Sequence, residues 1–408
     1  MKNGLFIVLL ATLFFACKKV EDPIVRIPVE DVQKVADMNN GLGWDLFLQM
    51  AKSSSDSNLL ISPLSVHTAM SMALNAAESN TFEEMSDVMH CKGCDETDIN
   101  EQNAKLRTLM EEQSGRASLT SANAFFFDEQ RIAPKQNFLN TINAHYGAES
   151  LHYDFNQDSA KDNINAWVKA KTNGKIDKIV ESIGPLDLAF LINALHFKAG
   201  WEHGFEPDMI WDADFTRNDG STVVVPFVSG DRLTSYIQTD EFNMVDFQFT
   251  DSTYSLSFVQ SKTPQVLGND WIQQVSWEDV RTAWGEMKFD RAFTSFPKLN
   301  IAYTAELKHP LSVLGMQAAF LPEAAQFGRL GTPLIGPTIY INTIKHKSVL
   351  KVDENGAEGA AVTSIGFATT SAPPSFRFDK PFVIILRHIP TNAMVFTGLV
   401  KDPSKTQD

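Results

Sequence analysis

The chain has 408 residues, of which 43% are hydrophobic and 21% are charged, and this composition indicates a globular protein rather than a disordered chain or a rod. Its 35 Lys and Arg residues against 50 Asp and Glu residues give a formal net charge of −15. A chain this acidic repels phosphate backbones, and it contains no block of five like charges, so no nucleic-acid partner is expected. Three cysteines are too few for a disulfide framework.

The N-terminal segment carries an export signal. Lys2 precedes the apolar run Leu5–Ala16, which spans about 18 Å as a helix and is too short for a hydrocarbon core of roughly 30 Å. A small residue directly before Cys17 resembles a bacterial lipobox, so we expect cleavage after residue 16 and lipid attachment to Cys17. The alternative is a plain secretory signal with an incidental cysteine. Residues 17–32 would then form a tether to a folded domain at 33–408, on a membrane-anchored lipoprotein of a bacterial envelope or cell surface.

Helical patterns come first along the chain. Val66–Ala77 is rich in helix formers and follows the start signal Ser62-Pro63. Further helices are predicted at Thr81–Met89, Asn100–Glu112, Pro134–Tyr146 (with Pro134 at its first position) and Asp158–Thr172. The apolar runs Ala122–Phe127 and Leu186–Phe197 lie among them, and the second is apolar enough to be a covered central strand.

Strand patterns dominate after Trp201. Helical spacing returns only around Ser276–Trp284 and Leu311–Met316. Strands are predicted at Thr222–Val228, Tyr236, Phe242–Phe249, Ser255–Val259, Phe296–Tyr303, Ile339–Val352, Phe376–Leu386 and Met394–Val400. Early helices and late strands predict a single α+β domain with large, mostly antiparallel sheets.

Motifs of enzymes are missing from the sequence. It has no G-x-S-x-G, H-E-x-x-H, Walker or G-x-G-x-x-G pattern, so we expect neither catalysis nor a cofactor. Cys91 and Cys94 form a lone C-x-x-C, and a structural zinc site needs four ligands. No metal site is therefore predicted, and the two cysteines are interpreted as a small local disulfide or as two ordinary thiols.

The segment 354–372 is the most unusual part of the chain. It is long for a loop, lies between two predicted strands, and contains small apolar residues where a solvated loop would be polar. Every second residue from Ala357 to Thr369 is uncharged, so that face could enter a sheet interior, while Glu358 would point outward. The segment therefore has the pattern of a strand that is exposed first and paired later.

With these motifs the sequence resembles the serpins, the serine protease inhibitor superfamily, over residues 35–403. The resemblance implies an α+β fold with three β-sheets, about eight or nine helices and an exposed reactive-centre loop. The segments that carry the resemblance are Asn58–Ala77, Asn163–Lys178, Leu191–Trp201, Val352–Thr363 and Phe376–Leu386.

The resemblance also implies a function and a set of site residues. A protease would attack one loop bond, and the loop would then insert into the large sheet and trap the acyl-enzyme. Glu354 would be the seventeenth residue before that bond, which places it at Thr370–Ser371, with Thr369–Thr370 as the alternative. The implied hinge residues are Glu354, Gly356, Ala357, Glu358, Gly359, Ala360, Ala361, Val362 and Thr363. The implied residues under the parting sheet are Ser62, Ser65, Asn193 and His346, with Trp201 at its top.

The same residues define the expected partners. The reactive bond lacks Lys and Arg, so the favoured targets are elastase-like or subtilisin-like serine proteases, with cysteine proteases as a second class. The helix that binds heparin in some relatives corresponds to Asn100–Glu112, where acidic residues offset the basic ones, so no heparin-type activator is expected. A monomer is expected. The alternative function is a non-inhibitory binding or storage protein.

Overall fold

The computed structural model describes residues 27–53, 57–111, 117–250, 252–263, 269–357 and 373–405. The sequence predictions for the signal peptide, for Cys17 and for the loop residues Glu358 to Ser371 lie outside these ranges.

Nine α-helices and three short 3₁₀ helices lie within the described ranges. The α-helices are α1 (Gln33–Ser53), α2 (Pro63–Leu74), α3 (Ser79–Val88), α4 (Glu96–Glu111), α5 (Gln136–Tyr146), α6 (Asp158–Lys171), α7 (Asn269–Ile272), α8 (Trp277–Glu286) and α9 (Lys308–Leu314). The 3₁₀ helices are η1 (Val29–Asp31), η2 (Pro207–Met209) and η3 (Ala318–Phe320). No helix in the described part of the chain combines the length and hydrophobicity needed to cross a membrane.

The strands form four sheets within the same ranges. The largest has nine strands: β1 (Leu59–Ile61), β17 (Met394–Val400), β16 (Phe382–His388), β9 (Tyr254–Ser261), β8 (Phe242–Gln248), β7 (Thr222–Gln238), β10 (Lys288–Pro297) and β15 (Ser375–Arg377) in that order, with β6 (Ile210–Thr216) paired to β7. A second sheet has the strand order β14 (Gly356–Ala357), β5 (Ala189–Gly200), β2 (Ala117–Phe127) and β4 (Glu149–His152). The other two join β11 (Leu299–Glu306) to β13 (Lys345–Val352), and β12 (Gly331–Pro333) to β3 (Ile132–Pro134).

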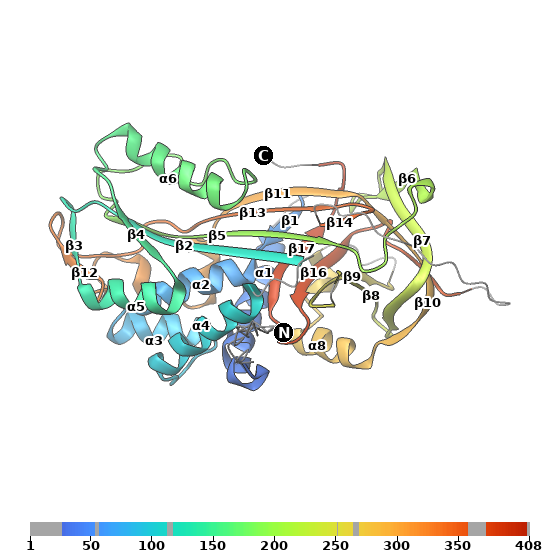
Figure 1. Ribbon diagram of the computed structural model, residues 1–408, viewed down its shortest axis with the longest axis horizontal. Helices are drawn as coiled ribbons and strands as arrows, with labels where there is room; N and C mark the ends of the chain where they lie inside the picture. The colour runs from blue at the N-terminus through green and yellow to red at the C-terminus, as the bar shows by residue number, and fades with distance from the viewer. Residues whose placement is uncertain are drawn as a thin grey trace, which may run out of the picture.

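The long strands β2, β5, β13 and β11 run side by side through the centre of the molecule, with α6 on one face and α2 to α5 on the other (Figure 1). One buried apolar cluster includes Phe125, Phe197 and Ala199, and a second, under α6, includes Ala194 and Ile164. Because both faces are covered, the β5 segment is as apolar as a central strand requires. The predicted α+β fold is confirmed, with nine α-helices in the described ranges where about eight or nine were expected, and with four sheets there where three were expected.

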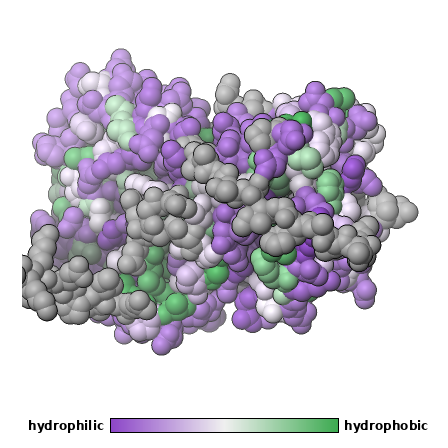
Figure 2. Space-filling model, turned by 45° about the vertical axis from the view of Figure 1, so that its right-hand side comes forward, coloured by the Kyte–Doolittle hydropathy of each residue, from purple (hydrophilic) through white to green (hydrophobic). Residues whose placement is uncertain are grey.

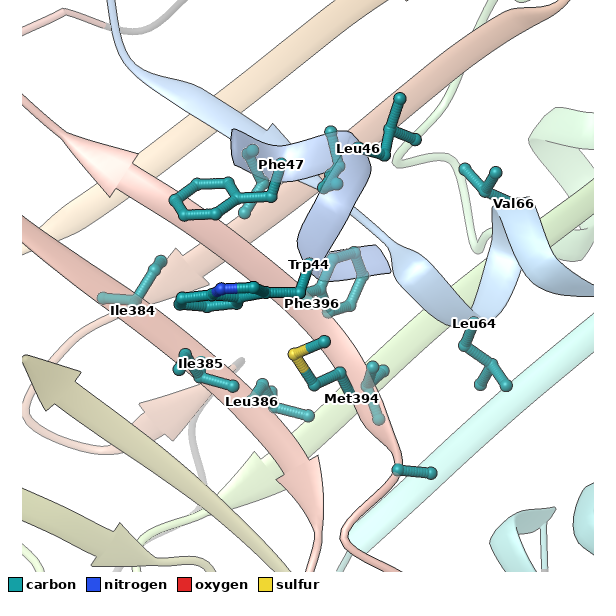
Figure 3. Packing of buried hydrophobic residues seen from close by; sticks show 14 of the residues in the cluster. Trp44, Leu46, Phe47, Leu64, Val66, Ile384, Ile385, Leu386, Met394 and Phe396 are labelled. Carbon is teal, nitrogen blue, oxygen red and sulfur yellow. The ribbon is translucent and has the colours of Figure 1, made fainter. Parts of the chain in front are cut away.

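Helix α1 was not predicted from the sequence pattern, although it is the longest helix of the described residues. Its Trp44 and Phe47 point toward β16 and β17, where Ile384 and Phe396 lie (Figure 3). Trp44 and Phe47 are 3% and 0% exposed. The polar residues Asn39 and Asn40 are buried as well, which obscures the amphipathic pattern of the helix in the sequence. Their side-chain amides donate hydrogen bonds to backbone carbonyls in and next to β17.

Several predicted boundaries are wrong. Pro134 does not begin a helix but ends β3, where it pairs with Gly331, and α5 begins two residues later. The predicted strand Phe296–Tyr303 is the junction of β10 and β11, because the chain leaves one sheet at Lys298 and enters another. Residues 339–344 form no ladder: the Ile341 N–H donates to the Ala319 carbonyl of η3, and the Ile344 carbonyl accepts from the Leu307 N–H before α9, so β13 begins only at Lys345.

Two other predicted segments also differ. Phe376–Leu386 contains two strands, β15 and β16, separated by the residues around Pro381. The two strands lie in different parts of the nine-stranded sheet, because β15 pairs with β10 and β16 pairs with β17. Leu186 is 62% exposed and lies before β5, so the predicted Leu186–Phe197 strand starts too early. Strand β6 was missed because its alternation is weak and it is an edge strand that pairs only with β7.

The face of the molecule seen in Figure 2 is mostly hydrophilic. In Figure 2 the described residues of the visible face are predominantly polar, and hydrophobic residues gather in small separate patches. Isolated exposed hydrophobic residues are normal on a soluble protein and define no binding surface by themselves.

Candidate functional site

The candidate site is the seam between β5 and β13. We define this seam as the boundary between the four-stranded sheet, which contains β5, and the two-stranded β11–β13 sheet. Strand β5 pairs with β2 from Ala189 to Ala199, and β13 pairs with β11 along its whole length. On their other edges the described residues provide only the two-residue strand β14, which pairs with β5. Most of both edges is therefore free to pair with a further strand.

Strand β14 fixes how such a strand would begin. Gly356 lies opposite Gly200, and Ala357 lies opposite Ala199 in an antiparallel register. Gly356 has a φ of 129°, and a Cβ atom there would lie 2.3 Å from the carbonyl oxygen of Ala199. Only glycine fits this close approach of two backbones. Ala357 is 1% exposed, so its side chain already lies in the sheet interior.

The turn before β14 is anchored to the end of β5 by Trp201. The Trp201 indole donates a hydrogen bond to the Asp353 carbonyl (2.8 Å), and its backbone N–H donates to the Asn355 carbonyl (3.1 Å). The indole is fully buried and stacks on Phe249 with ring centroids 4.5 Å apart. An ion pair between Lys298 and Glu354 (2.7 Å) holds the other side of the turn. Glu354, Trp201 and the start of β14 therefore form one structural unit.

A cavity lies at the opposite end of the seam. It has a volume of about 600 Å³ and is lined by the first residues of β5 and β13, by α2 and by the segments 179–188 and 335–344. Ser65, Asn193 and His346 all line this cavity. Three residues from distant parts of the sequence thus line one cavity.

On the β13 side, the polar groups are centred on His346. Its Nε2 accepts hydrogen bonds from the Ser62 backbone N–H (3.1 Å) and from the Ser348 hydroxyl (2.7 Å). Ser62 also caps helix α2, since its hydroxyl oxygen accepts from the Ser65 N–H (3.2 Å) and donates to the Val395 carbonyl (2.7 Å). The group therefore joins β13, α2 and β17.

On the β5 side, Asn193 belongs to a separate group. Its Nδ2 donates to the Ser121 hydroxyl and to Asn123 Oδ1, both at 2.8 Å, and Asn123 Nδ2 in turn donates to the Tyr146 carbonyl (2.8 Å). These bonds fix the orientation of the Asn193 amide. Its Oδ1 is left buried without a hydrogen-bond donor among the described residues. An unpaired buried acceptor is costly, and this oxygen lies on a residue that lines the cavity.

The sequence reasoning found four of these side chains but missed their partners. Asn123, Ser121 and Ser348 showed no signal of their own, because a polar residue within a strand can face solvent as easily as a polar cluster. Their role depends on the registers Asn123↔Asn193 and Tyr303↔Ser348, which are tertiary facts.

Burial lowers the pKa of His346 to about 4, from an ordinary value of 6.5. Between these two pH values the unfolded chain binds a proton that the folded protein does not, so folding stability falls as the pH drops from 6.5 to 4 and levels off below. A shift of this size is worth about 3 kcal/mol. We expect the urea unfolding midpoint to fall over this range, and to fall less steeply in His346→Gln. An equal slope in the variant would contradict the assignment. His67 and His388, whose pKa values are also lowered to about 4 by burial, contribute to the slope that remains.

The fold and the site define a class of protein: an α+β protein in which most of the seam between β5 and β13 is free to accept a further strand. A family model described as serpin (serine protease inhibitor) matches residues 37–403. The chain belongs to the serpin family. Its members are protease inhibitors or binding proteins rather than catalytic enzymes.

The relatives support this membership. Human serpin A12 is 26% identical over 374 residues, covering 91% of this chain and 88% of the relative. A serpin-like protein of Thermococcus kodakarensis is also 26% identical, covering 90% and 86%. The native state of tengpin, a thermophilic serpin, is 29% identical with a TM-score of 0.82, covering 90% and 94%. The latent state of tengpin gives a TM-score of 0.77, so this chain is more similar to the native state.

Proposed function

We propose that the protein is an inhibitory serpin that traps proteases by inserting its 358–372 loop into the seam. The observation that carries the proposal is the start of β14, which already pairs with β5 while most of both seam edges remains free. An antiparallel strand entering there would gain hydrogen bonds to β5 and β13 along its length. The small residues at 357, 359 and 361 suit the narrow interior face, where a charge or a large side chain would cost several kcal/mol.

The register of β14 predicts which residues of the inserted strand would lie opposite which residues of β5. Each step forward from Ala357 matches one step back from Ala199, so the continued ladder would place Thr363 opposite Asn193. The threonine hydroxyl could then donate to Asn193 Oδ1, the buried acceptor that has no partner. The same register would place Glu358 opposite the exposed Lys198, which is a favourable cross-strand charge pair. Both matches support insertion in this register.

Insertion explains how a protease would be trapped. The protease serine would attack the carbonyl of Thr370 or Thr369, and the amine of the next residue would leave, giving an acyl-enzyme. The strand from Glu354 to Thr370 would span about 17 residues, and its new part from Glu358 to Thr370, about 13 residues at 3.3 Å each, would carry the bound protease roughly 43 Å. The free energy gained by strand pairing would thus be used to deform the protease before water hydrolyses the ester.

The second candidate is a non-inhibitory binding or storage protein. Human thyroxine-binding globulin in complex with thyroxine has the same fold, with a TM-score of 0.82 at 23% identity. A binding protein does not need a seam that accepts a strand. The small buried Ala357 and the glycine at 356 therefore favour the inhibitor.

Incubation with a panel of proteases tests the proposal and its specificity. We expect an SDS-stable covalent adduct with elastase-like or subtilisin-like enzymes, because their pockets accept Thr369 or Thr370. Chymotrypsin-like enzymes that cut after Phe367 should trap less well, since the strand is then three residues, roughly 10 Å, shorter. Trypsin should trap least, because the segment 367–372 offers no basic residue. Efficient trapping of trypsin, with the new N-terminus inside 368–372, would refute this specificity.

We also propose that the protein is exported and anchored through a lipid on Cys17. The support is the signal-like segment 1–16 and the small residue before the cysteine. Cys17→Ser should leave export intact but move the protein from the membrane fraction to the soluble fraction. Unchanged membrane partitioning of this variant would show that the anchor lies elsewhere.

A further inference from the structure

The turn Cys91–Cys94 joins the end of α3 to the start of α4 and carries two free thiols. The Cys94 backbone N–H donates to the Cys91 carbonyl (3.0 Å), and Gly93 has a φ of 69°, which this tight turn requires. The ends of a β-turn lie within about 7 Å of each other, and this matches the Cα spacing of a disulfide. The backbone therefore already has a shape that a disulfide can close.

The two thiols have different environments. Cys91 is 1% exposed, and its backbone N–H donates to the Ser86 carbonyl (2.7 Å). Cys94 is partly exposed, and its sulfur is hydrogen-bonded to the Cys91 thiol. An oxidant in solvent therefore reaches Cys94 first, and the buried Cys91 thiol is in contact with the Cys94 sulfur.

Cys94 also lies beside a positive charge. The Lys34 ammonium of α1 interacts with the Cys94 sulfur and pairs with Asp98 of α4 at 3.2 Å. The 16-residue helix α4 begins two residues after Cys94, so its N-terminal dipole favours negative charge nearby. A cationic side chain and a helix N-terminus therefore lie next to the more exposed of the two thiols, with the Asp98 carboxylate close to the same ammonium group.

We propose that Cys94 and Cys91 form a peroxide-sensitive dithiol, in which the Cys94 thiolate is oxidised first and Cys91 resolves it to a disulfide. In the first step the Cys94 sulfur attacks one oxygen of hydrogen peroxide, the O–O bond breaks, and hydroxide leaves as Cys94 becomes a sulfenic acid. In the second step the Cys91 sulfur attacks the Cys94 sulfur. The S–OH bond breaks, and the hydroxyl leaves as water with the Cys91 proton.

Burial, followed by the hydrogen bond with Cys94, raises the pKa of the Cys91 thiol. Cys91 therefore remains protonated and reacts slowly with oxidants in solvent, and its proton is passed to the leaving hydroxyl when its sulfur attacks the adjacent sulfenic acid. The disulfide would link the end of α3 to the start of α4 covalently. This proposal does not depend on the inhibitory function.

The test treats the intact folded chain with hydrogen peroxide and maps the peptide that contains residues 91–94, which separates it from Cys17. We expect this peptide to lose two hydrogen atoms, about 2 Da, reversibly with a thiol reductant. In Cys91→Ser, dimedone should trap a sulfenic acid on Cys94. In the unmodified chain, brief alkylation with iodoacetamide should label Cys94 before Cys91, and this arm requires no variant.

Two lysine variants test the role of the charge. Lys34→Ala should slow peroxide oxidation and alkylation of Cys94 roughly threefold to tenfold, because it removes the cation that interacts with the Cys94 sulfur. Lys92→Ala is the matched control, because Lys92 lies inside the same turn but pairs with Asp87 and is 86% exposed, and its rates should be unchanged. Prior labelling of Cys91, sulfinic acid without a disulfide, or equal rates in Lys34→Ala and the parent chain would each overturn the proposal.

Discussion

Cleavage of the loop between residues 358 and 372 should raise the melting temperature by roughly 10 °C or more. The cut frees the segment after Ala357 to continue the β14 ladder, and opposite β5 this ladder can extend back to Ala189. About ten residues would then gain hydrogen bonds on two edges. At about 1 kcal/mol net for each residue, the gain is about 10 kcal/mol, which corresponds to a shift of roughly 12 °C for a domain of this size.

Calorimetry of the intact and the cleaved protein measures this effect. Peptide mapping must show a single cut within the loop, and the two fragments must remain associated on a sizing column. The increase should be accompanied by loss of inhibition, because the inserted strand cannot be offered to a protease again. Equal melting temperatures before and after the cut would show that the loop does not insert, and the binding or storage function would then be preferred.

Ala357→Arg should change the protein from an inhibitor into a substrate. Residue 357 is buried at the start of the seam, and an arginine there would place an unpaired charge in the sheet interior at a cost of several kcal/mol. Slower insertion gives water time to hydrolyse the acyl-enzyme. We expect the yield of SDS-stable adduct to fall at least about tenfold, the effect of 1.4 kcal/mol on the competition between insertion and hydrolysis. Ala361→Glu should behave in the same way.

Glu358→Arg is the matched control for this variant. It introduces the same side chain one residue further on, at a position that the β14 register places on the solvent face opposite Lys198. The two like charges would repel by less than about 1 kcal/mol, so most adduct should remain. Full adduct yield with Ala357→Arg, or an equal loss with both variants, would contradict the assignment of residue 357 to the interior face.

The sequence predicted local features whose physical signal is contained in neighbouring residues. Strand β17 was predicted with its observed bounds, Met394–Val400, because a short apolar run of seven residues is a complete signal for a covered strand. Helix α2 was recognised from its Ser62 cap and its helix formers, since capping is a local hydrogen bond. The period of two in the 357–369 segment predicts a strand that pairs late; of its inward face only Ala357 is among the described residues, and it is buried.

The long-range features were decided by the tertiary structure. The break between β10 and β11 at Lys298 follows from two different partner strands, β7 and β13, and no local signal separates them. The sequence placed Asn193 and His346 in one cluster, whereas the fold puts them in two hydrogen-bonded groups that line one cavity. Periodicity fixes which face a side chain occupies, but the partner across the seam is set by strand register, which only packing of the whole chain determines.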